Sequence, residues 1–194
     1  MLTLIVGGAR SGKSRFGQQL CSRQSHVAYV ATALIDTDSE MRARVERHRA
    51  DRPPGWRTIE EPLLLAEAVA REAVDSDYIL VDCLTLWLSN FLWTHRAVET
   101  TELERLALEE VEAAAAAGRE KNLVFVANEV GWGIVPETPV GRLFRDLQGL
   151  VNQRAAALAD EVFLTVAGIP LRIKPQAPAL VTGGVVAERE TVHA

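Results

Sequence analysis

A glycine-rich segment near the start of the chain combines the residue types that bind nucleotide phosphates. Its residues match the pattern G-x-x-x-x-G-K-[ST]: Gly7, Gly8, Ala9, Arg10, Ser11, Gly12, Lys13 and Ser14. The glycines let successive backbone N–H groups point at phosphate oxygens, and the helix expected to follow adds partial positive charge. Lys13 is predicted to act on the outer phosphates as a catalytic residue, and the Ser14 hydroxyl to ligate Mg²⁺. The segment therefore predicts a site for a nucleoside triphosphate.

A carboxylate placed directly after a second apolar run could complete the magnesium site. Asp82 follows residues 78–81, and Mg²⁺ beside a phosphate-binding loop is commonly held by the loop hydroxyl and a carboxylate beyond a neighbouring strand. Ser14 and Asp82 are therefore the predicted metal ligands. Two other roles stay open for Asp82, because it could instead bond a ribose hydroxyl or cap a helix over residues 84–91.

A single histidine lies in an arginine-rich segment with helical signals. Residues 38–54 begin with Asp and Ser, which favour helix starts, and end in two prolines, which stop helices. The arginines around His48 could hold phosphates and keep its imidazole neutral, and a neutral imidazole is a nucleophile toward phosphorus. The alternative is a half-buried histidine paired with a neighbour. The other histidines lack such surroundings and are interpreted as surface or packing residues: His26, His95 and His193.

The elements that would position these residues alternate between apolar runs and helical patterns. Strands are expected at residues 2–6, 27–31, 78–81, 123–127 and 161–166. The runs are continuously apolar, which favours an open, mostly parallel α/β sheet flanked by helices, with ligands beyond the carboxyl ends of the strands. The clearest helix covers 101–117, with Thr101 as its cap and Gly118 at its end. Residues 171–173 are expected to pair antiparallel with 161–166 as an edge strand.

Length and composition limit the classes of protein that fit. A chain of 194 residues with 48% hydrophobic content predicts one domain, residues 1–174, followed by a loosely ordered tail, residues 175–194. The absence of a basic leader and of a membrane-spanning apolar stretch predicts a cytoplasmic protein. A net charge of −5 disfavours nucleic acid as a partner. Cys21 and Cys83 lack metal-ligand spacing and are expected to be buried without a disulfide.

Several of these segments together resemble one enzyme family, the bifunctional adenosylcobinamide kinase / adenosylcobinamide-phosphate guanylyltransferases. The similarity covers about residues 2–174 and rests on these segments: GGARSGKSR at 7–15, YVAT at 29–32, Glu40, Met41, Arg44 and His48, WRTIE at 56–60, NEVGWGIVPE at 128–137, RLFRD at 142–146, Asn152, Gln153, Ala159 and Asp160. The phosphate-binding loop alone occurs in many unrelated nucleotide-binding proteins, but the ordered set is specific to this family. The chain's end, after Lys174, departs from the family pattern.

The resemblance implies a P-loop NTPase-like domain with two activities. The first would phosphorylate the aminopropanol hydroxyl of adenosylcobinamide with ATP or GTP. In the second, His48 would take GMP from GTP and pass it to adenosylcobinamide phosphate. Beyond the phosphate-binding loop, the implied nucleotide contacts are Thr32, Ala33, Leu34, Arg49, Ala50, Asp51, Arg52, Glu60 and Asp82. Similar proteins form trimers, so a homotrimer with a corrinoid substrate is expected.

Two other functions fit part of the sequence. A monofunctional small-molecule kinase would use the same loop and leave His48 with a structural role. A GTP-dependent regulatory module would also bind through the loop, but the chain has no N-K-x-D motif for guanine. The residues leave open whether ATP or GTP feeds the kinase step, and whether one nucleotide site serves both reactions.

Overall fold

The structure is a computed structural model that describes residues 1–34, 52–53 and 55–175 of the chain. Four predicted site residues lie outside the described residues: His48, Arg49, Ala50 and Asp51. So does the predicted tail from residue 176 onward. The phosphate-binding loop, Thr32, Ala33, Leu34, Arg52, Glu60 and Asp82 are all described.

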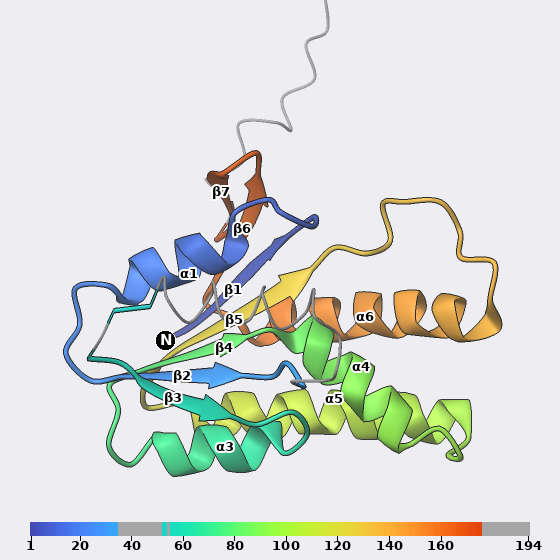
Figure 1. The fold of residues 1–194 in the computed structure, drawn as a ribbon, viewed down its shortest axis with the longest axis horizontal. Helices are drawn as coiled ribbons and strands as arrows, with labels where there is room; N and C mark the ends of the chain where they lie inside the picture. The colour runs from blue at the N-terminus through green and yellow to red at the C-terminus, as the bar shows by residue number, and fades with distance from the viewer. Residues whose placement is uncertain (35–51, 54, 176–194) are drawn as a thin grey trace, which may run out of the picture.

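A seven-stranded sheet forms the centre of the molecule (Figure 1). In spatial order, its strands are β3 (Arg57–Glu60), β2 (Val27–Ala31), β4 (Tyr78–Asp82), β5 (Asn122–Asn128), β1 (Leu2–Gly7), β6 (Glu161–Val166) and β7 (Ile169–Lys174). All neighbours pair in parallel except β6 and β7, which are antiparallel. The central strands are apolar and buried on both faces, as the continuous apolar runs predict.

Helices cover both faces of this sheet unequally in the described part of the chain. Helix α1 (Lys13–Cys21) lies on one face, and α3 (Leu65–Glu72), α4 (Leu84–Thr94), α5 (Thr100–Ala117) and α6 (Pro139–Leu158) lie on the other, as Figure 1 shows. Gly17 lets α1 approach closely, because a Cβ there would lie 3.1 Å from Leu80 and 3.4 Å from Val126. The larger core lies under the four helices and includes the fully buried Trp87 and Phe125.

The expected α/β fold is confirmed, with two local corrections. The five expected strands are present, and the antiparallel edge strand extends over Ile169–Lys174. The strand β3 was not expected, because most of its side chains are exposed. The cap of α5 was wrongly assigned to Thr101: the helix begins at Thr100, and the Glu99 side chain accepts from the backbone N–H groups of Thr101 and Glu102.

Both cysteines are free and buried, as expected for small apolar side chains. Burial raises the pKa of Cys83 to about 11 and that of Cys21 to about 12, so both thiols stay protonated at neutral pH. Within the described ranges, no helix is both long and apolar enough to cross a lipid bilayer.

Candidate nucleotide-binding site

The phosphate-binding loop starts where β1 ends and requires glycine at that point. Gly7 has a φ of 155°, and a Cβ there would overlap the backbone oxygen of Thr165 and lie 2.8 Å from Ser11 Oγ. Gly12 has a φ of 97° and caps α1 without a side chain. The amino end of α1 is therefore not covered by its own cap residue, which is the arrangement that binds anions at helix starts.

Lys13 lies inside this loop rather than in solvent. Its side chain is only 6% exposed, and its Nζ donates to the Gly8 carbonyl oxygen at 2.6 Å and to Ser11 Oγ at 3.4 Å. These contacts hold a positive charge among the backbone groups that would surround a phosphate. The geometry suits the predicted role of Lys13 at the outer phosphates.

The hairpin of β6 and β7 supports the loop from the side. Its two turn residues, Ala167 and Gly168, have φ values of 50° and 82°, as tight antiparallel hairpins require. The Gly168 backbone N–H donates to the Ser11 carbonyl oxygen at 2.8 Å. The phosphate-binding loop is thus fixed by an element more than a hundred residues away in the sequence.

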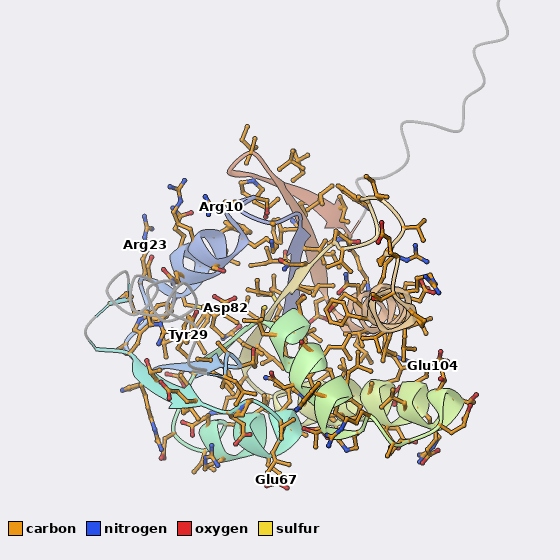
Figure 2. The ribbon with its side chains drawn as sticks, turned by 45° about the vertical axis from the view of Figure 1, so that its right-hand side comes forward. Arg10, Arg23, Tyr29, Glu67, Asp82 and Glu104 are labelled. Atoms are coloured by element: carbon orange, nitrogen blue, oxygen red, sulfur yellow. The ribbon has the colours of Figure 1, made fainter. Side chains whose placement is uncertain are left out.

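Asp82 lies at the carboxyl end of β4 and connects the loop to β2. Its Oδ1 accepts from Ser14 Oγ at 3.2 Å and its Oδ2 from the Tyr29 hydroxyl at 2.6 Å. Figure 2 shows Tyr29 and Asp82 close together below the loop that carries Arg10. The cap of α4 is Cys83, and no side chain caps that helix, so the alternative role of Asp82 as its cap is wrong. Ser14 and Asp82 together present hard oxygen atoms of the kind that Mg²⁺ prefers.

Tyr29 is a site residue that the sequence analysis did not single out. Burial and the Asp82 carboxylate raise the pKa of Tyr29 well above its usual value, so its hydroxyl stays protonated and donates to Asp82. The Arg52 guanidinium lies 3.8 Å from the centre of the Tyr29 ring, and its Nη1 donates to Thr58 Oγ1 at 3.2 Å. Arg52, a predicted nucleotide contact, is therefore joined to Asp82 through one tyrosine.

The other predicted nucleotide contacts lie toward the outer margin of the sheet, beyond β2 and β3. Thr32 is fully buried, and its Oγ1 donates to the Cys83 carbonyl oxygen at 2.7 Å and accepts from the Cys83 N–H at 2.8 Å, so its side chain joins β2 to β4. Ala33 is half-buried and Leu34 is 52% exposed. Glu60 is exposed at the end of β3, four strand positions from β1. The structure therefore separates this margin from the phosphate-binding loop. Both still lie at the edge formed by the carboxyl ends of the parallel strands, which we call the ligand edge.

Glu129 is a second residue that the sequence analysis left without a role. It follows β5 directly, and its backbone N–H donates to the Gly7 carbonyl oxygen at 3.0 Å. The rule that identified Asp82, a carboxylate directly after a buried strand at the ligand edge, identifies Glu129 equally well. Tyr29 offered a weaker signal, as a phenol in an otherwise aliphatic strand.

Comparisons with known proteins find relatives along most of this chain. A family model described as cobinamide kinase / cobinamide phosphate guanyltransferase matches residues 3–173. The bifunctional adenosylcobalamin biosynthesis protein CobU of Escherichia coli (strain K12) is 40% identical over 182 residues, which are 90% of this chain and 100% of that protein. The protein of the same name from Salmonella typhimurium is 41% identical over 182 residues, with the same coverage. The bifunctional adenosylcobalamin biosynthesis protein CobP of Pseudomonas aeruginosa is 43% identical over 175 residues, 90% of this chain and 98% of that protein.

Proposed function

Because the chain belongs to the cobinamide kinase / cobinamide phosphate guanyltransferase family, we propose how its residues divide the two activities. The protein is a bifunctional enzyme of cobalamin biosynthesis. In the proposed order of reactions, the protein first phosphorylates adenosylcobinamide with ATP or GTP, and then transfers GMP from GTP to the phosphorylated corrinoid. The hydrogen bond from Ser14 to Asp82, beside the buried Lys13, is the observation that carries the proposal.

In the kinase step, the phosphate-binding loop positions the triphosphate for direct transfer. Backbone N–H groups of the loop and the start of α1 bind the phosphate oxygens, and Lys13 neutralises charge on the outer phosphates. Ser14 Oγ and Asp82 Oδ1, 3.2 Å apart, would hold Mg²⁺. When bound, Mg²⁺ supplies charge neutralisation at the phosphate oxygens. Tyr29 keeps the Asp82 carboxylate oriented by donating to its other oxygen.

In the guanylyl step, His48 is the proposed carrier of GMP. Its neutral imidazole attacks the α-phosphorus of GTP, the bond to the leaving pyrophosphate breaks, and a phosphoramidate forms. A phosphate oxygen of the phosphorylated corrinoid then displaces the histidine. Support comes from the arginine-rich sequence around His48 and from Arg52, which lies on Tyr29 next to Asp82.

The margin beyond β2 and β3 is proposed to hold the nucleoside part of a nucleotide. Arg52 offers guanidinium donors, which suit ribose hydroxyl oxygens, and Glu60 offers a carboxylate, which can accept from ribose hydroxyls and guanine N–H groups. Leu34 adds an exposed apolar side chain at the same margin. Thr32 contributes by fixing the end of β2, since its side chain is bonded to Cys83, its backbone N–H donates to the Asp82 carbonyl oxygen and its carbonyl oxygen accepts from Asn90.

Assembly and location complete the proposal. A homotrimer is proposed, supported by the exposed apolar side chains of Trp132 and Ile134 at the ligand edge. The other tryptophan expected at a subunit boundary, Trp56, is half-buried against Tyr29 and offers weaker support. The cytoplasm is the proposed location, because it supplies both ATP and GTP.

The experiment that tests the division is covalent labelling. The protein is incubated with GTP labelled at the α-phosphate, denatured, and assayed for retained label and for intact mass. His48→Ala should abolish the label and the guanylyl transfer while keeping substantial ATP-dependent kinase activity. The control is His26→Ala, because His26 pairs with Asp77 at the exposed opposite end of the sheet and should label normally. Label that is stable to acid, or that survives in His48→Ala, would place the nucleophile elsewhere.

A further inference from the structure

Glu129 follows a strand that lies between the phosphate-binding loop and Asp82 in the sheet. In the sheet, β5 lies between β1, which leads into the phosphate-binding loop, and β4, which ends at Asp82. Asn128 at the end of β5 is in register with Gly7, and the Glu129 N–H donates to the Gly7 carbonyl oxygen at 3.0 Å. Because parallel strands end at the same edge, the Glu129 carboxylate belongs to the edge where the triphosphate is proposed to bind.

One buried amide on α6 holds this carboxylate, and a second orients the first. Asn152 Nδ2 donates to Glu129 Oε1 at 2.9 Å and to the Asn128 carbonyl oxygen at 3.0 Å. Gln148, one helical turn earlier, donates from Nε2 to Asn152 Oδ1 at 2.8 Å. The chain of donors has one direction: both hydrogens of the Asn152 amide are used, so its oxygen must accept from Gln148. The network therefore presents one N–H group, from Asn152, to the carboxylate.

These amides carry a cost that packing alone does not explain. Gln148 is fully buried, Asn152 is 6% exposed, and Gln148 Oε1 has no hydrogen-bond partner in the described part of the chain. An unpaired buried carbonyl oxygen costs on the order of 1–3 kcal/mol, and apolar side chains would fill the same core without that cost. The arrangement is consistent with amides retained for orienting Glu129.

We propose that Glu129 is the catalytic base of the kinase step, with Asn152 and Gln148 as positioning residues. The inference rests on the proposed function and deepens it. The O–H bond of the corrinoid's hydroxyl breaks and its proton moves to the Glu129 carboxylate. The oxygen forms a bond to the γ-phosphorus, and the bond to the β-phosphate bridging oxygen breaks with its electron pair leaving on the nucleoside diphosphate. Asp82 suits this task less well, because both its oxygens already accept hydrogen bonds.

The guanylyl steps need no such base. The histidine attacks as a neutral imidazole, and the corrinoid phosphate that accepts GMP is already an anion near neutral pH. Glu129 therefore serves one of the two activities only. This difference separates a catalytic role of Glu129 from a structural one, since a structural defect would lower the kinase and the guanylyl activities together.

Glu129→Gln is the decisive variant, because it removes the base and keeps an oxygen that can accept from Asn152. A general base contributes about a hundredfold or more to a rate. The kinase kcat should fall by at least about a hundredfold with KM values for both substrates little changed. Labelling by α-labelled GTP and guanylyl transfer to separately prepared adenosylcobinamide phosphate should stay within about twofold of the wild type. The control Glu137→Gln changes an exposed glutamate of the same loop and should keep both activities.

Asn152→Ala tests the positioning role. It should lower the kinase kcat about tenfold in the wild type and have no further effect in the Glu129→Gln background, because its contribution passes through the carboxylate. Additive effects would overturn the positioning role. Kinase activity kept in Glu129→Gln, or a parallel loss of kinase and labelling, would overturn the catalytic one. A wild type that lacks kinase activity or covalent label would instead contradict the proposed function itself.

Discussion

Two loops leave neighbouring strands at the ligand edge and differ in what holds them. The phosphate-binding loop after β1 folds on itself: Lys13 reaches back to Gly8, and the hairpin turn at Gly168 donates to Ser11. The loop after β5, residues 129–138, has its hydrogen bonds to the rest of the described chain near its two ends: Glu129 is bonded to Gly7 and Asn152, and Pro136 and Glu137 are bonded to Arg142 on α6. At its tip, Trp132 is 67% exposed and Ile134 is 97% exposed.

This difference separates two kinds of functional loop. The first has its conformation fixed by contacts within the described chain, so an anion meets groups that are already in place. The second presents apolar side chains that the described chain does not cover, which is typical of a surface that contacts another molecule. Changes in the first loop should affect chemistry and stability, and changes at the tip of the second should affect association.

The largest effect is expected from Lys13→Ala or Ser14→Ala. Both proposed steps need the triphosphate held by the loop, and losing one preorganised charged contact costs about 3 kcal/mol of transition-state stabilisation, roughly a hundredfold in rate. Phosphorylation of the corrinoid and GMP labelling should fall together, measured as initial rates at saturating nucleotide. Full kinase activity in Lys13→Ala would contradict the assignment of the loop.

A matched pair of glycine substitutions tests the contrast in rigidity. Gly7→Ala forces a Cβ against the Thr165 backbone and should destabilise the fold by about 2 kcal/mol, with loss of nucleotide binding. Gly131→Ala adds a Cβ with no atom within 4 Å and should change stability by less than about 0.5 kcal/mol. Urea unfolding measures both. Equal effects would remove the distinction between the two loops.

Tyr29→Phe should have a smaller effect on the kinase rate. Tyr29 is the residue of β2 that contacts the phosphate site, through Asp82. The variant removes the hydrogen bond to Asp82 and should lower the free energy of unfolding by about 1 kcal/mol, with a several-fold loss of kinase rate. Tyr78→Phe on the adjacent strand is the control, since its hydroxyl has no side-chain hydrogen bond among the residues that the structure describes. An unchanged rate in Tyr29→Phe would show that Asp82 is oriented without it.

Trp132→Ala should have the smallest effect on the folded protomer and act on assembly. The exposed side chain contributes little to the core, so the circular dichroism spectrum should stay the same while light scattering shows a weaker trimer. Trp93→Ala, 71% exposed near the far end of α4, should leave assembly intact. An unchanged trimer with a raised KM for the corrinoid would assign the loop tip to the substrate instead.

The buried half of the architecture was predictable from the sequence. The strand β5 is apolar at every central position and β1 at all but Thr3, and the glycine and lysine positions of the loop follow directly from its motif. The edge strand β3 was missed because only Ile59 of its four residues is even half-buried, so no apolar run marks it. Its pairing with β2 depends on backbone groups, which the sequence pattern does not show.

The polar contacts around the site were the least predictable part. Asp82 was found because it follows a strand, but its bond to Tyr29 depends on the register that places β2 beside β4. Asn152 lies far from Glu129 in the sequence, and an amide in the middle of a helix has no pattern of its own. Glu99, two positions before Thr101, is the cap of α5 because its longer side chain reaches two backbone N–H groups.

The place of β1 in the middle of the sheet also determines when the phosphate site can exist. Leu2 pairs with Leu123 on β5, and Thr3 pairs with Glu161 on β6, so the strand that carries the loop has both neighbours only after residues much later in the chain have been synthesised. Contacts between such distant segments form late in folding, because they close long loops. Triphosphate binding would therefore report completion of the sheet during synthesis, and a ribosome-bound fragment ending before β6 would lack one wall of its own phosphate site.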